Sequence, residues 1–175
     1  DDQASSHQEE FLDMVVISMC ANSGRSCINA STLVVTQKGD AWAQAIADRV
    51  AGMEPLPLDH PDAALAGFAR PNVAESIDQG VTQKLEEPGA TDVTDDSRET
   101  SRRGEKDGVH YLLPTVIRCD RVDHPLARTE YLFPFLSVVE MPREKMLNWI
   151  GPTLIATVVT QDQAWKKECI HCAHI

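Results

Sequence analysis

The sequence predicts an α/β fold, a three-layer sandwich in which a mainly parallel sheet is covered by helices on both faces. Helical and strand-like patterns alternate along the chain, which is typical of crossover connections between parallel strands. Several strand-like runs are continuously apolar rather than alternating, as in strands buried on both faces. The 175 residues, 42% of them hydrophobic, suffice for one core, so we expect a single domain over residues 1–175.

Two helices and a strand are predicted in the first third of the chain. Ser6 and Glu9 form a capping-box pattern before a first helix that should end near Cys20. That helix is apolar around most of its surface, so we expect it to be buried or covered. A strand of β-branched residues is predicted over 32–36, and a second helix over 40–50 with its first residue, an aspartate, as the N-cap.

The middle of the chain combines a loop, a helix and a polar stretch. The Pro-rich residues 52–61 predict a loop, and helical spacing of apolar residues resumes over 71–85 before a Pro-Gly pair stops it. Residues 90–108 contain almost no large apolar side chains. Because such a stretch has little to bury, we expect 90–108 to be a mobile loop.

Strands and helices are predicted to alternate again in the C-terminal part. Strands are expected over 109–119 and 135–139, and the apolar run 154–159 is expected to be a buried strand. Helices are expected over 144–150, which follows a proline and ends at a Gly-Pro pair, and over 162–169.

Composition excludes several classes of function. A net charge of −11 argues against nucleic acid or an anionic membrane as a partner, because binding phosphates needs a positive surface. No apolar stretch approaches the roughly 20 residues of a membrane span, and no apolar signal segment opens the sequence, so we expect a cytoplasmic protein. An odd number of cysteines favours free thiols over a disulfide framework. The five cysteines are Cys20, Cys27, Cys119, Cys169 and Cys172.

The run Asn-Ser-Gly-Arg-Ser-Cys at 22–27 places Cys27 on a turn between an apolar helix and a strand. Main-chain N–H groups at such a turn can stabilise a thiolate, and also the oxyanion that forms when the thiolate attacks a carbonyl carbon. Cys27 is therefore a candidate nucleophile. The alternative is a small buried side chain, the commonest environment of an unpaired cysteine.

Four segments together resemble the aldehyde dehydrogenase superfamily. The run 22–27 is similar to its active-site signature, Asn-x-Gly-Gln-x-Cys. Residues 113–117 resemble its Pro-Thr-Val strand, 130–134 its Glu-x-Phe-Gly-Pro run, and 154–162 its Leu-x-Ala-x-Val-x-Thr-x-Asp strand and turn. The four occur in the family's order and cover nearly the whole chain.

The resemblance implies oxidation of a small-molecule aldehyde to a carboxylic acid with NAD or NADP. Cys27 would be the nucleophile and its own N–H the oxyanion donor, with Asn22 and Gly24 shaping the turn. Glu130 would bind the nicotinamide-side ribose, and Leu132 would face the cofactor. Thiolate addition gives a thiohemiacetal, loss of hydride gives a thioester, and cysteine suits both steps. The acyl acceptor, whether water, coenzyme A or phosphate, stays open.

The chain departs from the family pattern at three positions and lacks two of its parts. Arg25 replaces a glutamine, Leu132 a phenylalanine, and Phe133 a glycine, where its bulk is expected to crowd the cofactor side. The dinucleotide-binding domain and the Glu-Leu-Gly-Gly general base have no counterpart here. We therefore expect a catalytic domain that is inactive alone and is completed by a dinucleotide-binding domain of the same longer chain. The resemblance also makes a homo-oligomer of the full protein an expectation.

Three other interpretations remain open. A non-catalytic relative could retain the fold as a scaffold. Cys20 and Arg25 nearly match the Cys-x5-Arg loop of cysteine phosphatases but are one residue too close together. Four residues near the C-terminus have the right ligand types for zinc but crowd together without a second pair, so we expect no metal site. These four are Cys169, His171, Cys172 and His174.

Overall fold

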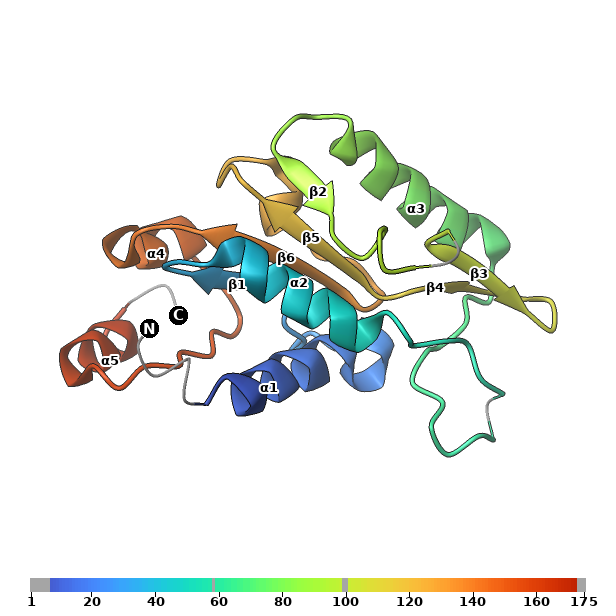
Figure 1. The fold of residues 1–175 in the computed structure, drawn as a ribbon, viewed down its shortest axis with the longest axis horizontal. Helices are drawn as coiled ribbons and strands as arrows, with labels where there is room; N and C mark the ends of the chain where they lie inside the picture. The colour runs from blue at the N-terminus through green and yellow to red at the C-terminus, as the bar shows by residue number, and fades with distance from the viewer. Residues whose placement is uncertain (1–6, 58, 99–100, 173–175) are drawn as a thin grey trace.

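A four-stranded sheet forms the centre of the molecule in the computed structural model, which describes residues 7–57, 59–98 and 101–172 (Figure 1). The strand order is β1-β6-β5-β2; β1, β6 and β5 are parallel and β2 is antiparallel to β5. A separate hairpin pairs β3 with β4. The strands are β1 (Thr32–Val35), β2 (Ala90–Asp92), β3 (Arg103–Lys106), β4 (Val109–Leu112), β5 (Thr115–Cys119) and β6 (Phe135–Glu140).

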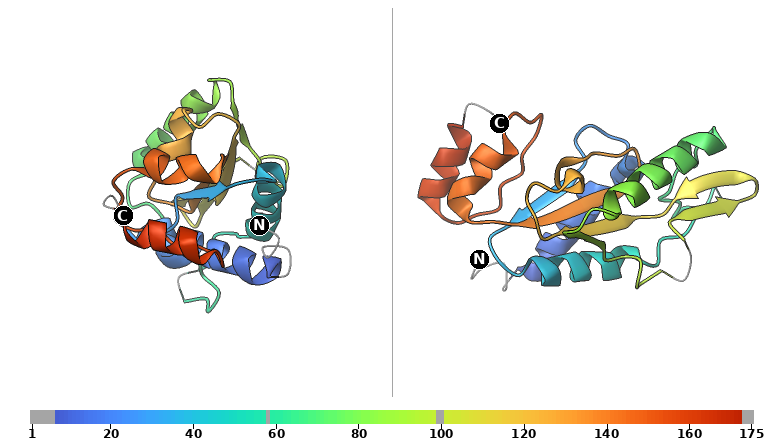
Figure 2. Two further views of the ribbon diagram at one scale, coloured as in Figure 1. Left: turned by 90° about the vertical axis from the view of Figure 1, so that its left-hand side faces the viewer. Right: turned by 90° about the horizontal axis from the view of Figure 1, so that it is seen from above.

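Helices cover both faces of this sheet, which confirms the predicted α/β class with its mainly parallel sheet (Figure 2). Helices α1 and α2 pack on one face, and α3, η2 and α4 on the other. The helices are α1 (Gln8–Cys20), η1 (Ala21–Gly24), α2 (Gly39–Val50), α3 (Pro71–Leu85), η2 (Pro125–Arg128), α4 (Arg143–Ile150) and α5 (Gln163–Ile170). No helix among the described residues is long and apolar enough to cross a membrane.

The alternation of side chains along β6 divides the core in two. Leu136 and Val138 face α1 and α2, whereas Phe135 and Val139 face α3 and η2. Because successive side chains of a strand point to opposite faces, a continuously apolar strand has to be covered on both. This arrangement explains why the run 135–139 contains no charged residue.

The first two helices differ from expectation in the exposure of α1 and in the N-cap of α2. The capping-box serine, Ser6, lies outside the described residues, and α1 exposes Met14 and Ile17, so it is not covered on all sides as predicted. Helix α2 begins after Lys38, and Asp40 lies in its first turn, so the predicted N-cap is wrong. The carboxylate of Asp40 instead accepts from Arg118 Nε of β5 at 2.7 Å.

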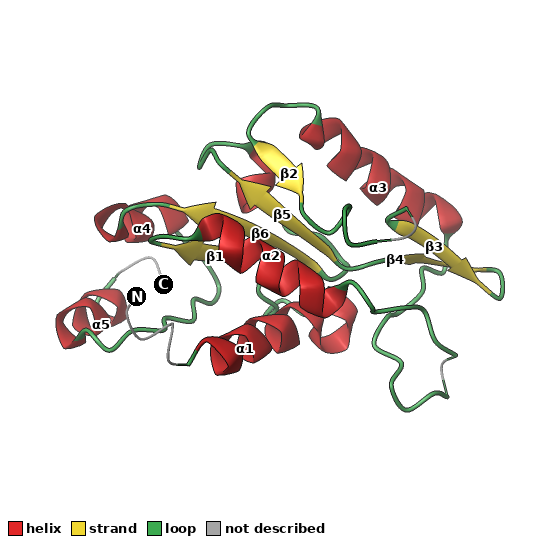
Figure 3. Cartoon of the chain, in the orientation of Figure 1, coloured by secondary structure: helices red, strands yellow, loops and turns green. Residues whose placement is uncertain are grey.

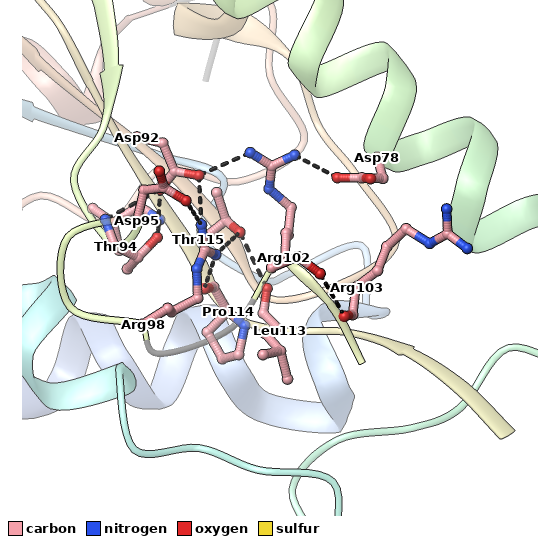
Figure 4. A network of polar contacts seen from close by, with 12 residues as sticks. Asp78, Asp92, Thr94, Asp95, Arg98, Arg102, Arg103, Leu113, Pro114 and Thr115 are labelled. Atoms are coloured by element: carbon pink, nitrogen blue, oxygen red, sulfur yellow. Dashed lines mark hydrogen bonds and ion pairs between the residues drawn. The ribbon is translucent and has the colours of Figure 1, made fainter. Parts of the chain in front are cut away.

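The polar stretch 90–108 contains strands β2 and β3, so the expectation of an unstructured loop is wrong for these residues. Buried charges replace the missing apolar side chains (Figure 4). Asp92 accepts from Arg98 at 2.7 Å and from Arg102 at 2.8 Å, and Arg102 also pairs with Asp78 of α3 at 2.7 Å. Nitrogen Nη1 of Arg98 further donates to Thr115 Oγ1 at 3.0 Å. Ion pairs of this kind anchor the stretch to the sheet and to α3.

The apolar run 154–159 is not a strand, so this prediction is wrong. It forms an irregular connection between α4 and α5 that pairs with neither edge of the sheet (Figure 3). Leu154, Ile155 and Val159 are more than half exposed. An apolar run predicts burial, but a strand also needs a neighbour for its N–H and C=O groups, and none of the described residues supplies one.

Candidate functional site

The chain reverses direction directly after α1 in a left-handed turn. Asn22, Ser23 and Gly24 have φ angles of 50°, 56° and 67°. For a residue with a side chain this region costs roughly 1–2 kcal/mol, so other contacts have to stabilise the turn. Ser23 is buried and its Oγ accepts from the Ala66 N–H at 2.8 Å, while the Arg25 N–H donates to the Asn22 carbonyl at 3.1 Å. We call residues 22–29 the cysteine turn.

Gly24 brings the cysteine turn against the Phe133–Pro134 peptide. A Cβ at Gly24 would lie 2.4 Å from the carbonyl carbon of Phe133 and 2.5 Å from both the Phe133 oxygen and the Pro134 nitrogen. No side chain fits such a gap, and the neighbouring atoms belong to the backbone and cannot rotate away. Glycine is therefore required here both for the positive φ and for the close approach.

Cys27 is exposed to solvent on a tight turn whose geometry is set by Asn29. The Asn29 N–H donates to the Ser26 carbonyl at 3.0 Å, and its Oδ1 accepts from the Ser26 N–H at 2.6 Å. Its Nδ2 donates to the carbonyls of Ser18 and Ala21 at 2.5 and 2.9 Å. Sequence reasoning missed Asn29, although asparagine beside a predicted turn is a known signal for such side-chain bonds.

The phosphatase interpretation does not fit the structure. Cys20 lies at the end of α1, and its burial raises the pKa of the thiol to about 11, whereas a nucleophilic cysteine needs a lowered pKa. The Arg25 guanidinium faces main-chain carbonyls of Ala66, Gly67 and Leu132 rather than a phosphate cradle. Neither group is arranged for phosphoryl transfer.

Glu130 is exposed, and its carboxylate makes no hydrogen bond or ion pair with the other described residues. We call residues 130–134 the glutamate run. Lys84 of α3 fixes both neighbours of Glu130, since its Nζ donates to Thr129 Oγ1 at 3.1 Å and to the Tyr131 hydroxyl at 3.2 Å. No described residue thus competes for the carboxylate, while the side chains on either side of it are held by Lys84. Sequence reasoning missed Lys84, because nothing local marks a helix residue that contacts a distant loop.

Phe133 points into the core, which corrects the expectation that it crowds the cofactor side. It is 2% exposed and packs against the rings of Tyr131 and Phe135, with centroids 5.9 and 5.8 Å away. Only its backbone faces Gly24. Leu132 has the opposite orientation and is 61% exposed. The bulk of Phe133 is therefore absent from the surface where Glu130 and Leu132 are exposed.

The predicted site residues are brought together in part. Gly24, Asn29 and Glu130 are among the residues that line one small pocket. Cys27 and Asn22 are exposed on the same turn but do not line this pocket. An exposed thiol and a carboxylate without a partner among the described residues therefore lie on two segments that touch through Gly24. Such a pair can combine nucleophilic attack by sulfur with binding of hydroxyl groups by a carboxylate.

The C-terminal cysteines and histidines do not form a metal site among the described residues, where no group of three potential ligands lies together. Cys169 is buried, Cys172 is half-buried, and the Nδ1 of His171 lies 2.7 Å from the Lys167 carbonyl. His174 lies outside the described residues.

Comparison with known proteins shows which family and which solved structures the chain is similar to. The sequence model of the aldehyde dehydrogenase family matches residues 4–170. No curated protein matches the sequence. Among solved structures, lactaldehyde dehydrogenase from Escherichia coli has a TM-score of 0.76 at 20% identity over 93% of this chain and 34% of its own. An NAD+ complex of aldehyde dehydrogenase from Bacillus cereus has a TM-score of 0.76 at 15% identity, over 93% and 33%. Betaine aldehyde dehydrogenase from Staphylococcus aureus, in complex with NAD+, has 0.74 at 17% identity, over 91% and 32%. This chain spans about a third of the length of these structures.

Proposed function

Because the chain belongs to the aldehyde dehydrogenase family, we propose that it supplies the cysteine nucleophile of an enzyme that oxidises an aldehyde to a carboxylic acid with NAD or NADP. One observation carries the proposal: Gly24 packs against the Phe133–Pro134 peptide, so the cysteine turn with its exposed Cys27 contacts the glutamate run. Glu130 of that run has no partner among the described residues. The proposed chemistry needs an accessible thiol as nucleophile and a nearby carboxylate as acceptor for ribose hydroxyls, and the two segments offer both.

Cys27 would act as the attacking group. Its thiolate adds to the carbonyl carbon of the aldehyde and forms a carbon–sulfur bond, and the former carbonyl oxygen becomes an oxyanion. Exposure of the Cys27 side chain on its turn gives a small aldehyde access to the sulfur. The backbone N–H of Cys27 is the proposed donor to the oxyanion, and the rigid turn held by Asn29 would keep that donor in place.

Glu130 and Leu132 would hold the cofactor. The two carboxylate oxygens of Glu130 can accept from the two hydroxyls of a ribose, and no described residue competes for them. Leu132 offers an exposed apolar side chain two residues further on. The residues present therefore fit an NAD(P) ribose, and two of the similar structures are complexes with NAD+. When bound, the nicotinamide supplies the hydride acceptor.

The thioester left on Cys27 after hydride loss has to be cleaved. Water attack releases the carboxylic acid and returns the thiol, and the general base for this step is not assigned to any residue of this chain. We propose that a dinucleotide-binding domain of the same longer chain completes the site. A homo-oligomer, a cytoplasmic location and the absence of nucleic-acid binding stay predictions.

A non-catalytic scaffold with the same fold is the second candidate. Leu132 favours it, because the family resemblance places an aromatic side chain at this position. The buried position of Phe133 removes the other argument for it.

Aldehyde oxidation by the full-length gene product tests the proposal. The rate of nicotinamide reduction is measured with a panel of aldehydes for the natural sequence and for Cys27→Ala, with Cys172→Ala as the matched control. We expect Cys27→Ala to abolish turnover and Cys172→Ala to retain it. Glu130→Gln should raise the KM for the nucleotide more than it lowers kcat, whereas Glu144→Gln should change neither. Turnover that survives in Cys27→Ala would refute the proposal, and a gene product without turnover on any aldehyde would favour the scaffold.

A further inference from the structure

Arg25 joins three segments that are far apart in the sequence. Its Nε–H donates to the Leu132 carbonyl at 3.2 Å, its Nη1 to the Gly67 carbonyl at 3.1 Å and its Nη2 to the Ala66 carbonyl at 2.8 Å. The guanidinium plane also lies over the Phe68 ring, 4.3 Å from its centroid. All three nitrogens of one side chain are thus used, and the three acceptors belong to backbone that no local sequence pattern links to Arg25.

Each of the joined segments has a place in the site. Arg25 itself lies two residues before Cys27, on the cysteine turn. Leu132 lies two residues after Glu130, in the middle of the glutamate run. The third segment, residues 66–68, is anchored to the β3–β4 hairpin because the Phe68 N–H donates to the His110 carbonyl at 2.8 Å. The hairpin therefore serves as a support to which the other two segments are tied.

We propose that Arg25 is a positioning residue, which fixes the cysteine turn and the glutamate run relative to one another by binding both to residues 66–68. This inference rests on the proposed function, in which Cys27 and Glu130 act on the aldehyde and the ribose. Arg25 is not a catalytic residue, since its donors are all directed at main-chain carbonyls.

Arginine is the side chain that these contacts require. Its guanidinium is planar and presents nitrogens in a rigid fork, so it can reach several carbonyls and stack on a ring at once. The glutamine that the family resemblance places here has one side-chain nitrogen and cannot reach three carbonyls on two segments. Lysine also has one nitrogen and no plane to stack on Phe68. This chain has therefore replaced a shorter side chain by a longer one with a different set of contacts.

Two further contacts show that the three segments depend on one another. The buried Ser23 Oγ accepts from the Ala66 N–H, so the cysteine turn meets residues 66–68 a second time. Gly24 touches the Phe133–Pro134 peptide, so the turn meets the glutamate run a second time. Neither contact spans all three segments, whereas Arg25 does. Loss of its side chain should loosen the other two contacts together.

Amide hydrogen exchange on the full-length gene product tests this directly, and it needs neither cofactor nor turnover. Arg25→Gln should speed exchange by about tenfold or more in the peptide that covers the hydrogen-bonded amides of 66–68 and in the peptide that covers Thr115, whose N–H donates to the Pro134 carbonyl of the glutamate run. Hydrogen bonds from a charged donor are lost at both ends. Arg143→Gln is the matched control. Arg143 also lies over a tryptophan ring, that of Trp165, and binds one acceptor, but it joins α4 to α5. Exchange at both segments should be unchanged in this variant.

Kinetics of the full-length gene product provide the second readout. Arg25→Gln should raise the KM for the nucleotide and lower kcat, with a combined loss of about tenfold to a hundredfold in kcat/KM, because a small displacement of a reacting group is costly. Arg25→Lys should not restore either value, since charge alone does not supply the fork.

The outcomes separate the two proposals. Unchanged exchange in Arg25→Gln, or a change at one segment only, would overturn the role of Arg25, as would full rescue by lysine. If the natural sequence shows no aldehyde oxidation while Arg25→Gln still speeds exchange at both segments, the proposed function fails and the link between the segments stands.

Discussion

Replacement of Gly24 by alanine tests the contact on which the site depends. The left-handed φ of 67° costs an alanine roughly 1–2 kcal/mol. Forcing a Cβ to 2.4 Å from the Phe133 carbonyl carbon adds about 1–3 kcal/mol of overpacking, because a backbone has to shift. The lower entropy of the unfolded chain offsets about 0.4–1 kcal/mol. We expect a net loss of about 3 kcal/mol in the free energy of unfolding.

Urea denaturation followed by circular dichroism measures this loss. With an m-value of about 2 kcal/mol/M, the midpoint of Gly24→Ala should fall by about 1.5 M. Gly108→Ala separates the two causes, because Gly108 has a φ of 77° but no atom within 4 Å of its Cβ position. After the same entropy offset, a net loss of about 1 kcal/mol is expected. Gly80→Ala lies within α3 in open space and should stabilise by about 0.8–1 kcal/mol. A Gly24→Ala midpoint equal to that of Gly108→Ala would refute the close approach of the two segments.

Three further predictions concern charge, thiols and the turn. Burial opposes ionisation of Asp92, but Arg98 and its other partners outweigh this and lower the pKa of the carboxyl, so its contribution to stability is present above about pH 4 and is lost as the pH falls further. Asp92→Asn should therefore lower the free energy of unfolding by about 3–5 kcal/mol at neutral pH. Urea unfolding at decreasing pH should show a smaller difference between the variant and the natural sequence, and a difference that does not change with pH would contradict this. Iodoacetamide at pH 8 should label Cys27 well before Cys20, whose pKa burial raises to about 11, as peptide mass spectrometry would show, and equal rates would contradict the exposure of the turn. Asn29→Ala should lower the free energy of unfolding by about 1–3 kcal/mol, since three main-chain groups lose their hydrogen-bond partner. An unchanged urea midpoint would count against this prediction.

The elements that sequence predicts well are those whose signal is local. The strand at 135–139 follows from a short apolar run and the helix at 71–85 from apolar periodicity, and the structure has β6 and α3 there. The run 154–159 has an equally strong apolar signal but no neighbouring strand among the described residues, and it stays irregular. Composition alone does not reveal whether a pairing partner exists.

The prediction of a mobile loop over the polar stretch 90–108 is wrong for the opposite reason. Its lack of apolar side chains predicts a loop, yet Arg98 and Asp92 bury their charges by pairing with each other. Such pairing is non-local, because Arg102 reaches Asp78 on α3. A count of hydrophobic residues cannot anticipate a buried network of arginines and aspartates, since each member alone would be read as exposed.

Sequence motifs predict the two segments that form the candidate site but not the residues that support them. The turn with Gly24 and Cys27 and the run with Glu130 follow from short patterns, and the structure brings the two segments into contact. Asn29 supports the cysteine turn through local bonds that asparagine beside a turn could have signalled, whereas Lys84 supports the glutamate run through a long-range contact that no local pattern encodes. Because Lys84 lies on another element, only the folded chain identifies it.

Acylation of the chain by p-nitrophenyl acetate tests the central claim most directly, because it asks which sulfur is the nucleophile without any cofactor. Brief reaction near neutral pH, followed by digestion and mass spectrometry, locates the acetyl group. We predict that it resides on Cys27 and that Cys27→Ser greatly slows release of p-nitrophenol. Acetylation shared about equally between Cys27 and Cys172, or concentrated on Cys172, would contradict the account.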